Sequence, residues 1–572
     1  MKNLMWHVLK LKLLFLFCIS FSAHAQLTFV SVVATQPFLP NSEIIPVPGS
    51  SISYTQIMFD HPPVAGAVRY DITASESQGQ TVYAPQIVSD SSTATWIEGF
   101  HFGHECSWFY TAYNAKNKAI FRSPDYKFTI LPLPLRNRVR VVTNDAAKNQ
   151  GGLISFDYHC MITDRDGTPV WFLPDEPKRE FSRDDKVRDI RVTNAGTITF
   201  ITNRNAFEIM TDGRIAWRGP KMGPHMVETL HHGIERLPNG HLMTLGNHTV
   251  KLQVPGDTAT IAVEFGVIAE YDRKGSLVWK WDSYNYLYPN DVEFRKLPNG
   301  QWASSSHMNA FRQVQEGDRF FVYAGFRDLD RIIRIDKATG KVDESYGRNM
   351  KSVNAWSGDN FFHAQHDVTP LYDGTIAVFN NDSVSKDGVV SSIVIFSRAK
   401  QGEESKVVWR FACDFDKLTS GKSEKCGSVD ELPNKNLLVN FGNINRCMEI
   451  TREGKIVWDA FTEYKASDTS AWLAAGQYRS HFTPSLYPVW FTTVLQKNTK
   501  KSTTISIWND GTEADTYTVE YLVGKNWIRL ASVELQPGRH TNCIIPKTKT
   551  APFTKIRVIS AHNLEFIRTI TL

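Results

Sequence analysis

Residues 361–381 read FFHAQHDVTPLYDGTIAVFNN. In this stretch two apolar runs, 368–371 and 375–379, flank the dipeptide Asp373-Gly374. An Asp-Gly pair between two runs of β-forming residues is a strong signal for a tight β-hairpin. The hairpin places His366 at its open end, so the sequence predicts that this histidine lies on a rim of the fold and not in its core.

The same hairpin pattern recurs along the chain from about Arg138 onward. A second pattern alternates with it, namely a strand that ends in tryptophan, as in GTPVWF, GRIAWR and GKIVWDA. Two hairpins per repeat are typical of four-stranded propeller blades, which close in a ring and so leave no exposed sheet edges. The sequence therefore predicts an all-β fold with a six-bladed β-propeller over residues 138–490. The recurring hairpins are 190–202, 234–246, 294–306, 368–380 and 430–442, and the units end at Trp171, Trp217, Trp279, Val342, Trp409 and Trp458.

Two further β-rich regions flank the repeats. Residues 26–135 contain short strand-like runs broken by Pro, Gly and Ser, a pattern that predicts an N-terminal β-sandwich. Residues 491–572 alternate in the same way and predict a C-terminal β-rich domain resembling a sandwich. Neither region gathers side chains for chemistry. We expect the N-terminal one to serve packing or assembly, with a homodimer as the preferred form of assembly.

The first 25 residues have the pattern of a secretory signal peptide. Lysines lead into the apolar run 13–21, and Ala23-His24-Ala25 supplies the small residues of a cleavage site. The mature protein is therefore expected in the periplasm or outside the cell. No later apolar run approaches the roughly 20 residues that a membrane helix needs, so no membrane insertion is expected.

Composition excludes some classes of partner. The chain is 42% hydrophobic and 22% charged, an ordinary globular mixture, and its formal net charge is +5. Lys and Arg are mixed with Asp and Glu throughout, without the basic stripe that nucleic acid would require. We expect no nucleic-acid partner.

An exported protein can form disulfides, so the cysteines beyond the signal peptide are candidates for pairing. Cys413 and Cys426 are the best pair, because only a short loop separates them. On the loop-entropy model such a bond stabilises by roughly 3 kcal/mol. The other four cysteines are too scattered to pair by spacing.

Three histidines converge on one end of the predicted propeller. His232 and His366 stand at the same distance before the leucine of their turns, so they occupy equivalent positions at the entrance of two innermost strands. His307 and Asn309 follow the hairpin 294–306, and Arg327 precedes the next strand. Polar side chains gathered at one mouth of a propeller channel form the concave kind of site that enzymes use.

At these residues the chain resembles the bacterial arylsulfate sulfotransferases, enzymes that need no nucleotide sulfate donor. The resemblance covers roughly residues 138–488 and rests on LHHGIERLPNG, HMNAF, FRDLDRI, QHDVTPLYDG and YRSHFTPSLYP. It implies a propeller enzyme that moves a sulfuryl group from an aryl sulfate to a phenol, without a cofactor. The pair Cys413 and Cys426 is similar to a short disulfide loop of that family.

By position, the resemblance implies roles for individual residues. His366 corresponds to the sulfated histidine, His307 and His232 to further active-site histidines, Arg327 to the sulfuryl-binding arginine and Asn309 to the asparagine beside it. The double His231-His232 leaves open which of the two points into the site.

The chemistry of sulfuryl transfer suits these residue types. A neutral imidazole is nucleophilic at pH 7, so His366 could carry the group between two displacements in a ping-pong mechanism through a sulfohistidine. The SO3 unit spreads charge over three oxygens, for which Arg327, Asn309 and His232 would supply donors. Proton transfer to and from the phenols needs a group with a pKa near 7, and His307 or His232 is expected to provide it.

Two other classes of function explain parts of the pattern. Inward histidines could instead hold a transition metal, although an adjacent arginine repels a cation. A non-enzymatic binding propeller would explain the flanking β regions but not the clustered histidines. At single positions, Arg327 could simply pair with Asp328 or Asp330, and Arg479 and His481 could equally be surface residues that close the ring.

Overall fold

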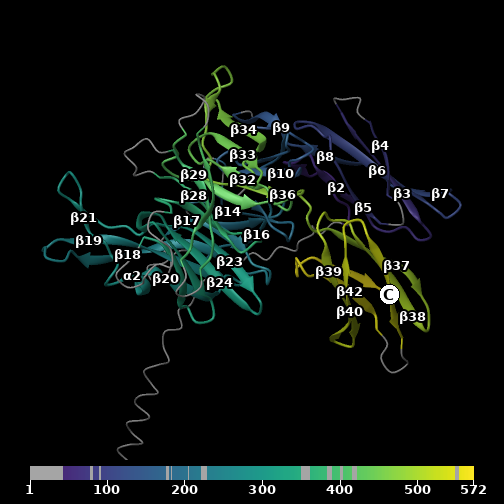
Figure 1. The fold of residues 1–572 in the computed structure, drawn as a ribbon. Coiled ribbons are helices and arrows are strands. Elements are labelled where there is room, and N and C mark those ends of the chain that lie inside the picture. The colour runs from purple at the N-terminus through teal and green to yellow at the C-terminus, as the bar shows by residue number, and fades with distance from the viewer. Residues whose placement is uncertain are drawn as a thin grey trace, which may run out of the picture.

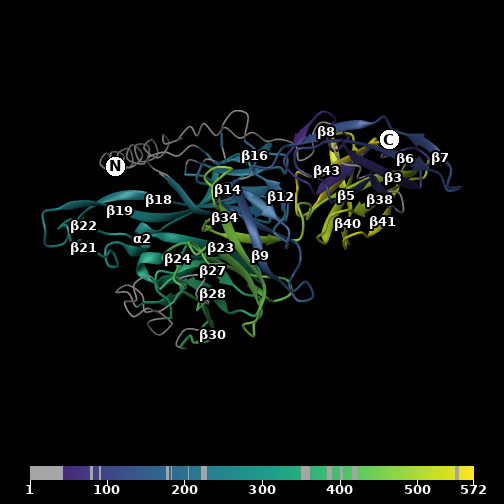
Figure 2. The ribbon, with the colours of Figure 1, turned by 90° about the horizontal axis from the view of Figure 1, so that it is seen from above.

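The structure is a computed structural model, drawn in Figure 1 and from above in Figure 2. It describes residues 43–77, 82–88 (backbone only), 92–134, 136–175, 180–181, 183, 185–203, 205–220, 229–348, 361–382, 390–399, 404–414, 421–547 and 553–572. The predicted signal peptide lies outside the described residues. No helix in the described part of the chain is long and apolar enough to cross a membrane.

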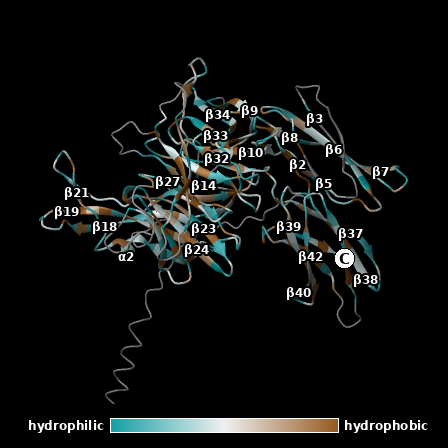
Figure 3. Cartoon of the chain, in the orientation of Figure 1, coloured by the Kyte–Doolittle hydropathy of each residue, from teal (hydrophilic) through white to brown (hydrophobic). Residues whose placement is uncertain are grey.

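The described chain is all-β, as predicted, and its middle part forms a series of sheets with a core of four strands each. In Figure 3 the apolar residues lie along these strands and the connecting loops are mostly hydrophilic, as expected for strands that bury their faces between neighbouring sheets. The sheets, called here sheets 1 to 6, consist of β10 (Leu153–Phe156), β11 (Met161–Thr163), β12 (Pro169–Phe172) and β36 (Ser480–Thr483); β13 (Arg188–Val192), β14 (Ile198–Ile201), β15 (Ala206–Ile209) and β16 (Ile215–Arg218); β17 (Thr229–Arg236), β18 (Leu242–Gln253), β19 (Thr260–Tyr271) and β20 (Leu277–Asp282); β23 (Met308–Glu316), β24 (Arg319–Phe326), β25 (Arg331–Asp336) and β26 (Val342–Gly347); β27 (His366–Pro370), β28 (Ile376–Asn380), β29 (Ser392–Phe396) and β30 (Val407–Ala412); and β31 (Ser428–Glu431), β32 (Leu437–Asn440), β33 (Arg446–Ile450) and β34 (Ile456–Tyr464).

In each sheet one edge strand contacts the corresponding edge strands of the two neighbouring sheets, and we call these six strands the inner strands. Each inner strand contacts the next one in the order β36, β13, β17, β23, β27 and β31, and β31 in turn contacts β36. The two ends of the series are interleaved. β36 comes late in the chain but pairs with β10 of sheet 1, and β9 (Asn137–Asn144) comes early but pairs with β34 of sheet 6.

Several of the recurring tryptophans link one sheet to the next. The indole N–H of Trp171 in sheet 1 donates to the carbonyl of Thr211 in sheet 2 at 2.8 Å, and Trp217 in sheet 2 donates to Asp272 in sheet 3 at 3.2 Å. Trp458 in sheet 6 donates to the carbonyl of Arg165 in sheet 1 at 2.7 Å. Each such buried bond contributes about 1 kcal/mol and satisfies a donor that would otherwise be stranded.

One predicted hairpin does not belong to a repeat. Residues 294–306 were expected to form the first two strands of a blade, but β21 (Arg295–Lys296) and β22 (Trp302–Ala303) form a separate two-stranded sheet. They lie with the long β18–β19 hairpin, which reaches away from the other sheets in Figure 1. A Pro-Asn-Gly turn specifies a hairpin but not which sheet the hairpin joins, so the innermost strand of sheet 4 is β23 instead.

The predicted disulfide between Cys413 and Cys426 is not formed, and both cysteines are buried. Cys413 packs in an apolar cluster with Phe379 and Phe441. Cys426 lies near Tyr158 instead, and burial raises the pKa of its thiol to about 11. The short loop brings the two residues close in sequence, but their side chains pack against different neighbours.

The flanking sheets pack on each other and on sheets 1 and 2. Their apolar residues join one continuous core, from Ile57 near the N-terminus to Phe566 near the C-terminus, and Figures 1 and 2 both show the two regions side by side. The N-terminal strands are β1 (Ser51–Ile52), β2 (Ile57–Asp60), β3 (Arg69–Glu76), β4 (Val82–Val88), β5 (Ala94–Ile97), β6 (Glu105–Tyr113), β7 (Ala119–Arg122) and β8 (Tyr126–Ile130); the C-terminal ones are β37 (Phe491–Asn498), β38 (Ser502–Asn509), β39 (Asp515–Val523), β40 (Asn526–Leu535), β41 (His540–Pro546), β42 (Lys555–Ser560) and β43 (Ile567–Thr571).

Short elements complete the fold. β35 (Leu473–Ala474) extends sheet 6, the helix α2 (Ser283–Leu287) follows β20, and the 3-10 helix η2 (Arg327–Leu329) joins β24 to β25.

A half-buried carboxyl group lies where the two flanking regions meet. Asp510 accepts hydrogen bonds from Ser92 at 2.6 Å and from Thr492 at 2.8 Å. Burial raises its pKa to about 7, with the nearby Asp60 adding to the effect. The folded chain therefore keeps a proton that the unfolded chain loses near pH 4, so the free energy of unfolding falls as pH rises from about 4 to 7.

We expect Asp510→Asn to remove this pH dependence while keeping the shape of the side chain. Between pH 5 and pH 7 the wild type should lose up to about 1.4 kcal/mol per pH unit relative to the variant. Urea unfolding at pH 5, 6, 7 and 8 measures the difference. A difference between the two proteins that stays constant over this range would show that Asp510 is ionised throughout.

Candidate active site

The inner strands β13, β17, β23 and β27 each carry a β-bulge near their first residue. A bulge bends the strand and changes the direction in which its side chains point. A residue with positive φ sits at or beside each bulge, a conformation that residues other than glycine adopt only where their surroundings impose it. These residues are Asp189, His232, His307 and Asp367. The backbone near the start of each of these four inner strands therefore has the same unusual conformation, with a positive φ at one residue.

Histidines and a tyrosine meet at this end of the inner strands. The Nε2 atoms of His232 and His307 lie 3.1 Å apart. The ring of Tyr478 stacks on His232 with centroids 5.2 Å apart, and it is edge-on to His366 at 6.3 Å. The ring of His231 is 4.6 Å from that of His232, and both of its nitrogens are buried without a hydrogen-bond partner in the described part of the chain. Both members of the His231-His232 pair thus line the site, and His232 is the one in contact with His307.

The tautomer of His366 follows from its neighbour Asn381. The amide nitrogen of Asn381 donates to the carbonyls of Ser423 at 2.9 Å and Cys426 at 3.0 Å, so its oxygen must face His366. That oxygen lies 2.7 Å from Nδ1 of His366 and can only accept, which places the proton on Nδ1. Nε2 therefore carries the lone pair, and within the described residues it makes no hydrogen bond.

His366 is 3% exposed, so the expectation of a rim position is wrong. His366 does begin its strand, but the ring of Tyr478 lies against it and β27 is flanked by β23 and β31 of the neighbouring sheets. Burial lowers the pKa of His366 to about 3, against the hydrogen bond that its Nδ1–H donates to Asn381, and Arg327 and His307 lower it further. The imidazole is therefore neutral at pH 7.

The pKa values of His232 and His307 are also lowered, which favours the neutral forms of both rings. Burial, with His231 and His307 beside it, holds the pKa of His232 well below its usual range. Burial also lowers the pKa of His307, although Asp328 opposes the shift. An acid-base role of His307 or His232 stays a prediction; burial, which disfavours the charged imidazole, is the main cause that lowers both pKa values.

Arg327 and Asn309 approach His366 from sheet 4. One guanidinium nitrogen of Arg327 lies 2.7 Å from a carboxylate oxygen of Asp328, so the ion pair weighed as the structural alternative does form. Arg327 nevertheless lies close enough to lower the pKa of both His366 and His307. Asn309 is fully buried, and its amide nitrogen donates to the carbonyl of Gln365 at 2.8 Å. Asn309 therefore holds the backbone directly before His366.

A layer of buried charges lies along the inner strands next to the histidines. Asp157 accepts the backbone N–H groups of Asp189 at 3.1 Å and Arg479 at 2.9 Å. His481 lies between two carboxylates, with Nε2 2.7 Å from Asp189 and Nδ1 2.6 Å from Asp430. Arg479 and His481 are 3% and 4% exposed, so they are not surface residues.

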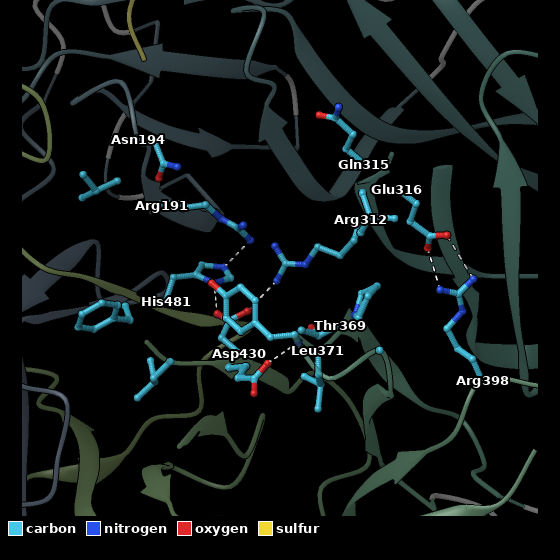
Figure 4. A pocket seen from close by; sticks show the side chains of 18 residues that line it. Arg191, Asn194, Arg312, Gln315, Glu316, Thr369, Leu371, Arg398, Asp430 and His481 are labelled. Carbon is cyan, nitrogen blue, oxygen red and sulfur yellow. Dashed lines mark hydrogen bonds and ion pairs between the residues drawn. The ribbon is translucent and has the colours of Figure 1, made fainter. Parts of the chain in front are cut away.

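A cavity of about 760 Å³ opens at the opposite ends of the same strands. In Figure 4 the guanidinium groups of Arg191 and Arg312 point into it, beside His481 and Asp430. Its lining includes Leu371 from the end of β27, whereas His366 begins that strand. The cavity and the histidines are thus separate, with the layer of buried charges between them.

Sequence reasoning placed His366, His232, Arg327 and Asn309 near one another, and the structure brings them together. His307 also lies at the site, but it stands directly before inner strand β23 and does not follow a second strand as expected. Tyr478, Asn381 and Arg188 also belong to the site but were not predicted from the sequence. Arg188 adds to the effect of burial in lowering the pKa of His231 and His232. Arg188 stands at the start of β13 as His366 does in β27, and this equivalence is the signal that could have identified it.

Comparisons with solved structures give only weak likenesses. The dihydro-heme d1 dehydrogenase NirN is 9% identical over 62% of this chain and 78% of its own, with a TM-score of 0.28. Kluyveromyces lactis Hsv2p is 14% identical over 66% and 96%, with a TM-score of 0.25. Kuenenia stuttgartiensis hydrazine synthase is 11% identical over 63% and 97%, also with 0.25. Such scores carry no argument about function.

A family comparison is decisive. No curated protein matches the chain. A family model described as arylsulfotransferase (ASST), however, matches residues 139–474. This span includes sheets 2 to 6, strands β10 to β12 of sheet 1, and His231, His232, His307 and His366, the histidines that meet at the site. The chain therefore belongs to the arylsulfotransferase family.

Proposed function

We propose that this arylsulfotransferase moves a sulfuryl group from an aryl sulfate to a phenol in two displacements through His366. The observation that carries the proposal is the state of that ring. Its Nδ1–H is committed to Asn381, its pKa is about 3, and Nε2 is left with a lone pair and no hydrogen bond in the described part of the chain. A neutral, oriented imidazole is what a nucleophile at pH 7 requires.

In the first displacement Nε2 of His366 attacks the sulfur of the aryl sulfate, an N–S bond forms and the bond from sulfur to the aryl oxygen breaks. The departing phenolate takes a proton from a neighbouring acid. In the second displacement the acceptor phenol loses its proton to that same group, its oxygen attacks the sulfur and the N–S bond breaks. The sulfuryl group and one proton are thus exchanged between two phenols, and no cofactor is consumed.

His307 is the proposed acid and base. It touches His232 at 3.1 Å; burial lowers the pKa of His307, and Asp328 opposes that shift. A bound sulfuryl anion would raise the pKa of the nearby histidines further, because an opposite charge favours the protonated form. The pKa of His232 lies well below its usual range, so His232 would stay neutral and donate a hydrogen bond to a sulfuryl oxygen. Arg327 would stabilise the charge on the SO3 unit.

The metal alternative is less well supported. Three donor atoms that lie within 4.8 Å of one another occur, among the described residues, at Glu76, His101 and His104 and not among the site histidines. Holding one ion at the active site would require the histidines to move together, next to Arg327 and Arg188. A non-enzymatic binding propeller leaves the free nucleophilic edge of His366 without a role.

We also propose that sheets 1 to 6 are the blades of one closed β-propeller. The support is the cyclic order of contacts between inner strands, the pairing of β36 with β10, and the bond from Trp458 in sheet 6 to Arg165 in sheet 1. Export to the periplasm or beyond the cell, through the signal pattern of residues 1–25, and self-association through the N-terminal sheets stay predictions.

A test of the proposed reaction follows the donor half alone. With a chromogenic aryl sulfate and no acceptor, the protein should release one equivalent of phenol per active site and then stop. Intact-mass measurement should show one added sulfuryl group, which disappears when a phenol is added. Steady-state double-reciprocal lines at different acceptor concentrations should be parallel, since both substrates never need to be bound together.

Three results would argue against this account. Intersecting lines would indicate a complex of both substrates, and the absence of a burst would indicate direct transfer. Turnover that a chelator removes and a metal ion restores would favour the metal alternative.

A further inference from the structure

A buried carboxylate and two histidines converge in the N-terminal region, away from the active site. Nδ1 of His101 and Nδ1 of His104 both lie 3.0 Å from the same oxygen of Glu76. All three atoms lie within 4.8 Å of one another. Glu76 ends β3, and both histidines are in the turn between β5 and β6.

The turn holds the two imidazoles in place through its backbone. The N–H of His101 donates to the second oxygen of Glu76 at 2.6 Å, and the carbonyl of His104 accepts the N–H of Ile130 at 2.9 Å. Gly103 lies between the histidines with φ 85, in the left-handed region that favours glycine. Both rings are thus directed at one carboxylate by a turn that is anchored to neighbouring strands.

The charge of Glu76 has little compensation. Its side chain is 1% exposed, and within the described residues it pairs with the two histidines and with no lysine or arginine. A buried carboxylate next to two imidazole nitrogens, with no lysine or arginine paired to it among the described residues, is an environment that favours a bound cation.

We propose that Glu76, His101 and His104 form a binding site for a divalent transition-metal ion. Two imidazole nitrogens and one carboxylate oxygen are a donor set that suits Zn²⁺, with Co²⁺ as a spectroscopic substitute. The side chain of His101 is 66% exposed, so a fourth position for water lies on the solvent side. The ion would fasten the turn to the end of β3, and this role is independent of the proposed sulfuryl transfer.

The test uses the full mature chain after dialysis against a chelator. Titration with Co²⁺ should give the visible absorption of a four-coordinate ion and saturate at one ion per chain, and Zn²⁺ should displace it. The midpoint of thermal unfolding should rise with Zn²⁺, because the ion binds the folded state. Glu76→Gln and His101→Ala should each weaken Co²⁺ binding at least about tenfold, as expected when a metal ligand is lost.

Two controls keep the assignment specific. His101 is exposed, so His101→Ala opens no core cavity and its unfolding without metal should match that of the wild type. His232→Ala removes an active-site imidazole and should leave Co²⁺ binding unchanged. Loss of binding in His232→Ala but not in Glu76→Gln would move the ion to the active site and overturn the proposal, as would the absence of saturable binding.

Discussion

His366→Ala is expected to abolish sulfuryl transfer, with a loss of about 10⁴-fold or more in turnover, the size of effect seen when a covalent nucleophile is removed. No other neutral imidazole of the site has the same arrangement of a committed Nδ1–H and a free Nε2 in the described part of the chain. The burst of phenol and the added sulfuryl mass should disappear together. Both are measured with the donor alone.

Because His366 is buried, the alanine variant also opens a cavity, and the cost for buried large-to-small changes is roughly 2–5 kcal/mol. His366→Asn fills more of the space and can still donate to Asn381, so it separates loss of chemistry from loss of fold. His363→Ala is the matched control, since His363 lies in the same segment, is 34% exposed and pairs with Asp330. It should keep its activity. Near-normal turnover in a folded His366→Asn protein would discard the nucleophile.

Arg327→Ala is expected to slow both half-reactions by about 3 kcal/mol, which is roughly 150-fold, as for the loss of one donor to a developing anion. Both displacements pass through a transition state with the same SO3 charge, so the burst rate and the rate of sulfuryl discharge to phenol should fall together. Rapid-mixing measurement of each half-reaction tests this. Arg327→Lys should recover part of the rate, because it keeps the charge but loses the planar fork.

The ion pair with Asp328 offers a purely structural explanation for Arg327, and Asp328→Asn distinguishes the two. If Arg327 acts on the sulfuryl group, removing its partner should change the rates much less than removing Arg327 itself. Equal losses in both variants, or an Arg327→Ala effect confined to one half-reaction, would assign Arg327 a positioning role only.

Local sequence patterns determined much of this protein. The alternation of apolar residues, the Asp-Gly and Asn-Gly turns and the recurring tryptophans predicted an all-β chain of repeated units, because strand periodicity and turn chemistry are properties of short segments. The equivalent positions of His232 and His366 before their turns also placed them at one end of the fold. The family motifs added Arg327 and Asn309 to the same site.

Tertiary structure alone decided the state of the active-site groups. Whether His366 is exposed depends on Tyr478, which is distant in sequence, and its tautomer depends on the hydrogen bonds of Asn381. The hairpin 294–306 joins no repeat, and Cys413 and Cys426 face different neighbours, because a turn or a short spacing does not specify which surface a segment packs against. Burial, charge and bonding partners arise from long-range contacts, and these set the pKa and orientation of His366, whereas the sequence set only its identity and place along the strand.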